Sequence, residues 1–176
     1  MSGQHTGRTD IPLTLRGRRQ GELLRAAVGG RRFALVLTSP LARATETCRL
    51  AGLSGVAKQR EELAEWDYGA YEGRKTPEIR EERPGWFLWD DGVPGGETAE
   101  EVGVRVDRVV PEIRAADGDV ALFAHGHVLR IVGARWIGLP PDHGALLALS
   151  TASISVLGWE RETAVIERWN ETTAAT

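Results

Sequence analysis

Cysteine is almost absent from this sequence, in which Cys48 is the only one among 176 residues. A chain with one thiol can form neither an intramolecular disulfide nor a cluster of thiolate metal ligands. No apolar run approaches the roughly 18 residues that cross a bilayer, and residues 1–7 lack the apolar core of a secretory signal. We therefore expect a cytoplasmic protein that does not associate with membranes.

An excess of positive charge is missing as well. The 22 basic and 25 acidic residues give a net charge of −3 and a pI near 5.9, which argues against a nucleic-acid partner. The 41% hydrophobic and 27% charged residues are average for a globular domain. Without repeats or low-complexity linkers, residues 1–176 are read as a single domain.

The first third of the chain predicts a helix, a strand and a second helix. Thr14 is a good N-cap for a helix that ends at the glycine pair 29–30. The apolar run 33–37 predicts a strand buried on both faces. The serine–proline pair 39–40 then begins a helix over 41–51.

The second half of the chain continues this alternation. Thr98 and Glu101 form a capping box ahead of an amphipathic helix. A second buried strand, 119–124, runs directly into a helix over 128–137, and residues 154–169 predict a terminal hairpin. Together these elements predict a three-layer α/β fold, with a mainly parallel sheet and helices on both faces.

Two of the predicted strands end on residues suited to binding an anion. The strand 33–37 leads to Arg43 on the first turn of its helix, and the strand 119–124 leads to His125 and Gly126 at a helix start. Ligands of open α/β sheets bind beyond the carboxyl ends of the strands. A guanidinium group, an imidazole and helix-start N–H groups together suit a phosphate dianion.

Four short motifs follow one another along the chain. They are Gly3-Gln4-His5-Thr6-Gly7, Ser39-Pro40-Leu41-Ala42-Arg43, Glu65-Trp66-Asp67-Tyr68-Gly69 and Ala124-His125-Gly126-His127. In this order they resemble the histidine phosphatase family, whose fold is that of phosphoglycerate mutase. The resemblance covers most of the chain and implies a hydrolase of small phosphate esters that needs no cofactor.

The resemblance also implies roles for particular residues. Arg43 would bind the phosphoryl group, and His125 would hydrogen-bond it and steady its charge. Glu65 would be the general acid that protonates the leaving alkoxide, which calls for a raised pKa. Thr6 and Gly7 would line the substrate loop. Tyr68, which would help to form an apolar wall beside Glu65, and Gly126 complete the set of expected substrate-binding residues.

One part of the family pattern is not found. The family's nucleophile is the histidine of an Arg-His-Gly triplet that ends its first strand, and no such triplet occurs here. His5 has no apolar strand before it and is not read as a displaced nucleophile. We expect the nucleophile to lie in a segment before residue 1, so that the domain is incomplete at its N-terminus. The missing strand is expected between the strands at 33–37 and 119–124.

Several side chains allow other interpretations. His125 and His127 could be a metal pair, but the chain offers too few further ligands for a zinc site. Cys48 is expected to be a small buried apolar residue, and Trp86 and Trp89 are candidates for substrate contact.

The function also has alternatives. A mutase of the phosphoglycerate type would carry a longer insertion between Glu65 and His125 than the roughly sixty residues present here. This spacing favours a phosphatase. The motifs at residues 3–7 and 66–73 resemble those of the broad-specificity acid and sugar-phosphate phosphatases of the family, which implies a small phosphorylated metabolite, with sugar phosphates as candidates. A non-catalytic protein that binds phosphate ligands is the alternative from another class. The substrate and the existence of a homodimer stay open.

Overall fold

The computed structural model describes residues 3–172 and contains the predicted alternation of helices and strands. The helices are α1 (Leu15–Val28), α2 (Ala42–Leu50), α3 (Thr76–Glu82), α4 (Leu88–Asp91), α5 (Ala99–Arg114) and α6 (Gly126–Trp136). The strands are β1 (Leu35–Thr38), β2 (Ala57–Gln59), β3 (Val120–Phe123), β4 (Ser153–Glu160) and β5 (Thr163–Thr172). The short elements β2 and α4 were not predicted.

Local capping signals in the sequence set the start of two helices. The Thr14 hydroxyl accepts a hydrogen bond from the Gly17 N–H at the start of α1. Thr98 and Glu101 form the predicted capping box at the start of α5. Both predictions are confirmed, because each cap is made by residues close together in the sequence.

The starts of α2 and α6 differ from those predicted. The second helix begins at Ala42, one residue after the predicted start, with Leu41 rather than Ser39 as its N-cap, and the Ala42 N–H donates to the Asp10 carboxylate at 2.7 Å. The helix after β3 begins at Gly126 rather than Val128. A carboxylate from a distant segment binds the first N–H groups of each helix. In α6 that carboxylate belongs to Glu65.

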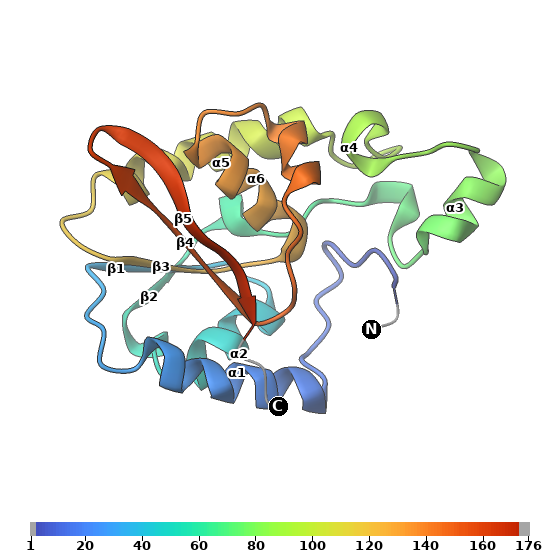
Figure 1. Ribbon diagram of the computed structural model, residues 1–176. Coiled ribbons are helices and arrows are strands. Elements are labelled where there is room, and N and C mark those ends of the chain that lie inside the picture. The colour runs from blue at the N-terminus through green and yellow to red at the C-terminus, as the bar shows by residue number, and fades with distance from the viewer. Residues whose placement is uncertain (1–2, 173–176) are drawn as a thin grey trace.

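Three parallel strands form the central sheet in the order β2-β1-β3. Helices α1 and α2 lie on one side of this sheet, and α5 and α6 lie on the other, as Figure 1 shows in an edge-on view. The predicted three-layer α/β architecture is confirmed. Because the sheet is parallel, the carboxyl ends of β1 and β3 lie at the same edge.

The expected place for a missing strand is wrong. Strands β1 and β3 pair directly over four residues, from Leu35 opposite Val120 to Thr38 opposite Phe123. The Ser39 N–H extends the ladder by donating to the Phe123 carbonyl at 2.8 Å. Apolar residues on both faces of each strand predicted interior strands, but such a pattern does not indicate which strands are neighbours.

The second edge of β3 is open within the described residues. No strand in residues 3–172 pairs with it, and all four residues of β3 are partly exposed. Strands β4 and β5 form a separate antiparallel hairpin, so β4 also has one unpaired edge. This hairpin packs on α6, where the rings of Trp136 and Trp159 lie 5.4 Å apart. An open edge carries N–H and C=O groups that can pair with a further strand.

The main apolar core extends from the central sheet to the loops and helices that follow β2 in the chain. Trp66, Trp86 and Trp89 are all buried in it. The expectation that Trp86 and Trp89 contact substrate is therefore not supported, since their rings pack against other side chains. Cys48 is buried as expected, and burial raises its pKa to about 11. In residues 3–172 no helix is long and apolar enough to cross a membrane.

Candidate active site

Arg43 and His125 meet at the carboxyl edge of the sheet. The Arg43 Nε group donates to His125 Nδ1 at 3.1 Å, and His125 Nε2 lies 2.7 Å from the Ser39 hydroxyl. Ser39 and His125 are buried at the ends of β1 and β3. The proximity that the sequence predicted for Arg43 and His125 is confirmed, because the two strands that precede them are direct neighbours.

The other donors of Arg43 bind backbone carbonyls of the N-terminal loop. Its Nη2 group donates to Thr6 O at 3.2 Å and to Gly7 O at 2.8 Å, and its Nη1 group donates to Thr9 O at 3.0 Å. Partial burial lowers the pKa of Arg43, but a guanidinium group stays charged at neutral pH. Arg43 therefore brings Thr6 and Gly7, both expected in the substrate loop, against His125.

Glu65 lies at the N-terminus of α6. Its Oε1 atom accepts from the N–H groups of Trp66 at 3.0 Å and Val128 at 3.1 Å, and its Oε2 atom accepts from the His127 N–H at 3.2 Å. The Glu65 residue is buried, and Gly126 at the helix start lies beside its carboxylate. Glu65 and His125 are thus held next to each other by the first turn of α6.

The pKa of Glu65 is lowered, which contradicts the expected raised value. Burial alone would raise it, but the positive charge that His127 and His125 gain at acid pH, together with the backbone N–H donors of Trp66 and His127, stabilises the carboxylate and outweighs burial. The expectation rested on the apolar residues beside Glu65 in the sequence, and it missed the helix start. Glu65 is therefore ionised at neutral pH in the absence of a ligand.

His127 and Tyr68 form a pair that sequence reasoning missed. The Tyr68 hydroxyl lies 2.6 Å from His127 Nδ1, and burial raises the pKa of Tyr68 so that its phenol stays protonated. The His127 ring lies 5.4 Å from the ring of Trp89 and 6.1 Å from that of Trp66. Tyr68 thus makes a polar contact with His127, and its role in substrate binding stays a prediction.

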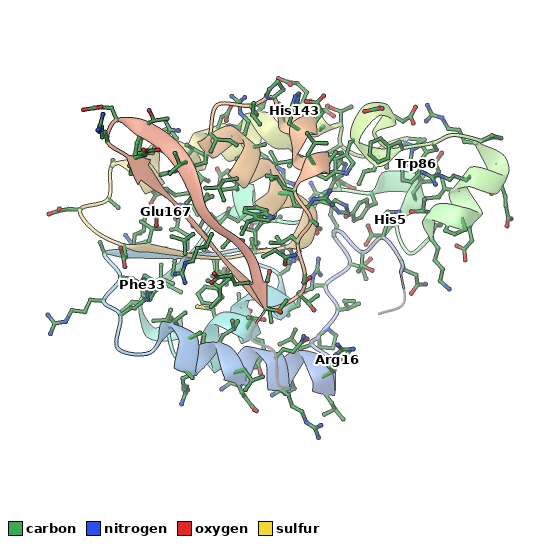
Figure 2. The ribbon with its side chains drawn as sticks, viewed as in Figure 1. His5, Arg16, Phe33, Trp86, His143 and Glu167 are labelled. Carbon is green, nitrogen blue, oxygen red and sulfur yellow. The ribbon has the colours of Figure 1, made fainter. Side chains whose placement is uncertain are left out.

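His5 extends this cluster into the N-terminal loop, as Figure 2 shows with its neighbour Trp86. Its Nε2 atom lies 3.1 Å from the Thr76 hydroxyl, and its ring lies 4.9 Å from that of Tyr68. Burial lowers the pKa values of His5 and His127. Both imidazoles are therefore neutral at neutral pH and can donate and accept hydrogen bonds.

Glu72 holds the N-terminal loop through two backbone N–H groups. Its Oε1 atom accepts from the Gly7 N–H at 2.8 Å and from the Thr9 N–H at 3.1 Å. Gly7 approaches Trp66 so closely that an added Cβ would lie 2.1 Å from the Trp66 carbonyl oxygen. Only glycine fits at that position, which explains the residue that the family motif has there.

The histidines do not form a metal site with their neighbours. Among residues 3–172, no group of three or more His, Cys, Asp or Glu side chains is arranged to hold a metal ion. The two histidines of the possible pair face different partners, since His125 contacts Ser39 and His127 contacts Tyr68. His143 is part of neither cluster, and Figure 2 shows it well apart from His5.

The folded state should lose stability below neutral pH because of His125. Burial lowers the pKa of His125 from 6.5 to about 4, so the unfolded chain binds a proton at a higher pH than the folded chain. Its contribution is complete above pH 6.5 and is lost as the pH falls towards 4, by about 2 kcal/mol between pH 7 and pH 5. Urea unfolding should show a smaller difference between these pH values for His125→Asn than for wild type. An unchanged difference would contradict the assigned environment, and His143→Asn is the control.

Known proteins are similar to this chain in sequence and in architecture. A family model described as the histidine phosphatase superfamily (branch 1) matches residues 1–172. An acid phosphatase of Mycobacterium tuberculosis is 42% identical over 162 residues, covering 90% of this chain and 79% of the relative. A sedoheptulose 1,7-bisphosphatase of Saccharomyces cerevisiae is 36% identical over 173 residues, covering 78% and 63%. A solved structure of the open reading frame Rv3214 of M. tuberculosis matches with a TM-score of 0.90 and 40% identity, over 97% of this chain and 90% of that one.

Proposed function

The chain belongs to the histidine phosphatase superfamily, and from that premise we propose that it hydrolyses small phosphate monoesters through a phosphohistidine intermediate. The observation that carries this proposal is the meeting of Arg43, His125 and Glu65 around the N-terminus of α6. A permanent cation, an imidazole and oriented N–H groups are the groups that stabilise a transferring phosphoryl group.

Arg43 and His125 are proposed to bind the phosphoryl oxygens. The Arg43 guanidinium now contacts three loop carbonyls, and a phosphate dianion is a stronger acceptor than these neutral oxygens. A bound phosphate would therefore replace some of the carbonyl contacts and hold the Thr6–Gly7 loop through the same side chain. His125, with a pKa of about 4, would act as a neutral hydrogen-bond partner.

Glu65 is proposed to protonate the leaving oxygen. An ionised carboxylate cannot do so, but a phosphate dianion placed beside it repels its negative charge and raises its pKa. Substrate binding would thus raise the pKa of Glu65, which the surrounding residues do not raise by themselves. The three N–H donors keep the carboxyl group in one orientation while it gains and loses this proton.

The nucleophilic histidine is proposed to lie on a strand outside residues 1–176. The second edge of β3 supports this, because it is unpaired within residues 3–172 and β3 ends two residues before His125. A further strand that paired with this edge parallel to β3 would place its carboxyl end beside His125, which contacts Arg43. The histidines already described are held by other partners, such as Thr76 for His5 and Tyr68 for His127.

The substrate is proposed to be a sugar phosphate. Three polar rings lie in contact beside Glu65, those of His5, Tyr68 and His127. All three are uncharged at neutral pH. Neutral donors and acceptors suit the hydroxyl groups of a sugar better than a second charged group. The yeast relative is named as a phosphatase of a sugar bisphosphate, which agrees with this class.

Phosphate release tests this function. The chain preceded by a family Arg-His-Gly strand should release inorganic phosphate from a panel of sugar phosphates. Arg43→Ala should raise the KM at least about tenfold, because it removes a charged phosphate ligand. Arg49→Ala is the control, since Arg49 lies on the same helix but pairs with Glu46 at the surface. Binding of inorganic phosphate without any release of phosphate from the esters would contradict catalysis. Transfer of the phosphoryl group between positions of phosphoglycerate would indicate a mutase.

A further inference from the structure

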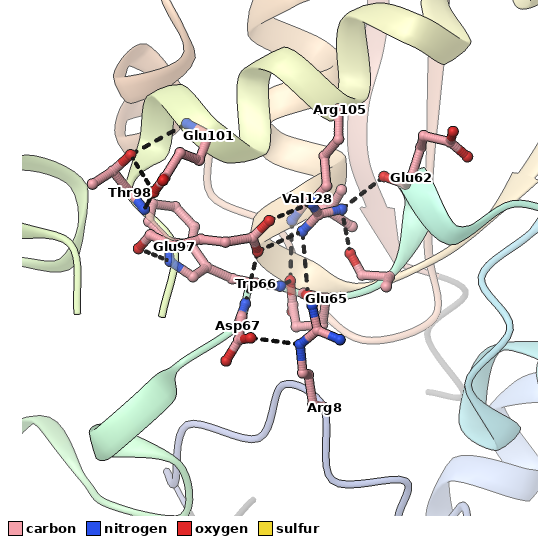
Figure 3. A network of polar contacts seen from close by, with 11 residues as sticks. Arg8, Glu62, Glu65, Trp66, Asp67, Glu97, Thr98, Glu101, Arg105 and Val128 are labelled. Atoms are coloured by element: carbon pink, nitrogen blue, oxygen red, sulfur yellow. Dashed lines mark hydrogen bonds and ion pairs between the residues drawn. The ribbon is translucent and has the colours of Figure 1, made fainter. Parts of the chain in front are cut away.

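We propose that Arg105 and Glu97 are positioning residues that hold Glu65 in place for proton transfer. The inference rests on the proposed role of Glu65 and adds two residues that the family motifs above do not include. Arg105 lies on α5, and Glu97 lies in the turn just before that helix. Figure 3 shows both side chains directed at the segment around Glu65.

Arg105 binds the backbone of the Glu65 segment at three places. Its Nη1 group donates to Glu62 O at 2.7 Å and to Ala64 O at 2.8 Å, and its Nη2 group donates to Glu65 O at 3.2 Å. The side chain is only 14% exposed. A buried guanidinium group with this many acceptors is firmly oriented, so the carbonyls that it binds are fixed to α5.

Glu97 completes the connection on the other side of Glu65. Its carboxylate accepts from Arg105 Nε at 2.8 Å and from Arg105 Nη2 at 3.1 Å, and also from the Asp67 N–H at 2.9 Å. Its backbone exchanges two further bonds, since Glu97 N donates to Asp67 O and Glu97 O accepts from Trp66 Nε1. The residues on both sides of Glu65 are therefore attached to one Arg105–Glu97 ion pair.

The segment needs this external support. Apart from the turn at 61–63, residues 61–68 belong to no helix or strand, so no regular ladder fixes their backbone. The Glu65 carboxylate, in contrast, must reach the first turn of α6. The Arg105–Glu97 pair fixes the main chain of Glu65, and α6 fixes its carboxylate. A displacement of about 1 Å in a catalytic group can lower a rate by about a hundredfold.

Arginine is required in this position because of its shape. Three carbonyls and a bidentate carboxylate use all three guanidinium nitrogens of Arg105. A lysine keeps the charge but has one nitrogen and three N–H donors, so it cannot bind all of these acceptors. Arg105→Lys therefore keeps the positive charge and removes most of the hydrogen-bonding geometry.

Comparing kcat for two substrates distinguishes a loss of Glu65 positioning from a general effect of the substitution on folding. Nitrophenolate leaves as a stable anion without a proton, whereas the alkoxide of glycerol phosphate needs an acid. In the phosphatase-active protein, Arg105→Lys should lower kcat for glycerol phosphate by roughly 10- to 100-fold and for p-nitrophenyl phosphate by less than about threefold. The matched control is Arg135→Lys, since Arg135 binds Asp107 and the Leu139 carbonyl in a similar fork away from the site.

An equal loss on both substrates would overturn the positioning role. A second measurement does not depend on activity. The His127 and Val128 amides donate to the Glu65 carboxylate, so their NMR shifts should move in Arg105→Lys and stay unchanged in Arg135→Lys. Unmoved shifts in Arg105→Lys would also overturn the inference. A wild-type protein that releases no phosphate from any ester would instead refute the proposed function, and the amide shifts would still decide the positioning.

Discussion

Residues 1–176 preceded by a family Arg-His-Gly strand should hydrolyse p-nitrophenyl phosphate at least about a thousandfold faster than residues 1–176 alone. In the proposed mechanism the added strand would supply the histidine that attacks phosphorus, whereas Arg43 and His125 would only stabilise the phosphoryl group. A steady-state assay of both proteins measures this ratio. Replacing the grafted histidine by asparagine should return the rate to that of residues 1–176.

The same pair of proteins tests where the strand belongs. The open edges of β3 and β4 leave backbone groups unpaired within residues 3–172, and β3 is apolar yet partly exposed. A strand that pairs there buries apolar surface at about 25 cal/mol per Å² and satisfies those groups. The extended protein should therefore melt at a higher temperature.

Two results would contradict this account of the nucleophile. An equal melting temperature for the two proteins would show that the added strand does not join the sheet. Rapid hydrolysis by residues 1–176, abolished by His125→Ala, would show that the nucleophile has been placed in the wrong segment. An acid-labile phosphoenzyme trapped on the grafted histidine would agree with the proposal.

Glu65→Gln should lower kcat for an alkyl phosphate by roughly 10²- to 10⁴-fold, because it removes the proton donor. The affinity for inorganic phosphate should not fall, and should rise to the extent that the ionised Glu65 carboxylate repels the dianion, since Arg43 and His125 remain. Glutamine can place its oxygen against the Trp66 and Val128 N–H groups. Its amide nitrogen then faces the His127 N–H, so a small loss of stability is also expected.

The pH dependence gives a second test of Glu65. A general acid works only while it is protonated, so kcat should fall as the pH rises through the pKa of Glu65 in the substrate complex. Glu65→Gln should lose this dependence, whereas Glu112→Gln, at a surface ion pair with Arg60, should keep it. A wild-type kcat that stays constant from acid to neutral pH would contradict the proposed acid.

Local patterns in the sequence predicted most of the secondary structure. Thr14 and the Thr98–Glu101 box set helix starts through neighbours in the chain, so their effect could be predicted without the fold. The same holds for the strands β1 and β3, whose apolar runs are short and continuous, although β3 is only partly buried. The proximity of Arg43 and His125 followed because both come after parallel strands, whose carboxyl ends lie at one edge.

The starts of α2 and α6 were predicted less well for a physical reason. Their first N–H groups are bound by the carboxylates of Asp10 and Glu65, which lie 32 and more than 60 residues away along the chain. No local pattern announces such a cap. Distant contacts also reverse the expected pKa shift of Glu65, because the His127 and His125 side chains and the N–H groups of Trp66 and His127 stabilise its charge against burial.

The sequence by itself determined which residues carry charge, which segments are apolar, and which motifs resemble the family. The tertiary structure alone decided that β1 and β3 are neighbours, that Trp86 and Trp89 are buried, and that Arg105 and Glu97 support Glu65. These features depend on contacts between segments far apart in the chain. Hydrophobic burial favours such contacts without specifying partners, so the partners emerge only when the whole chain packs.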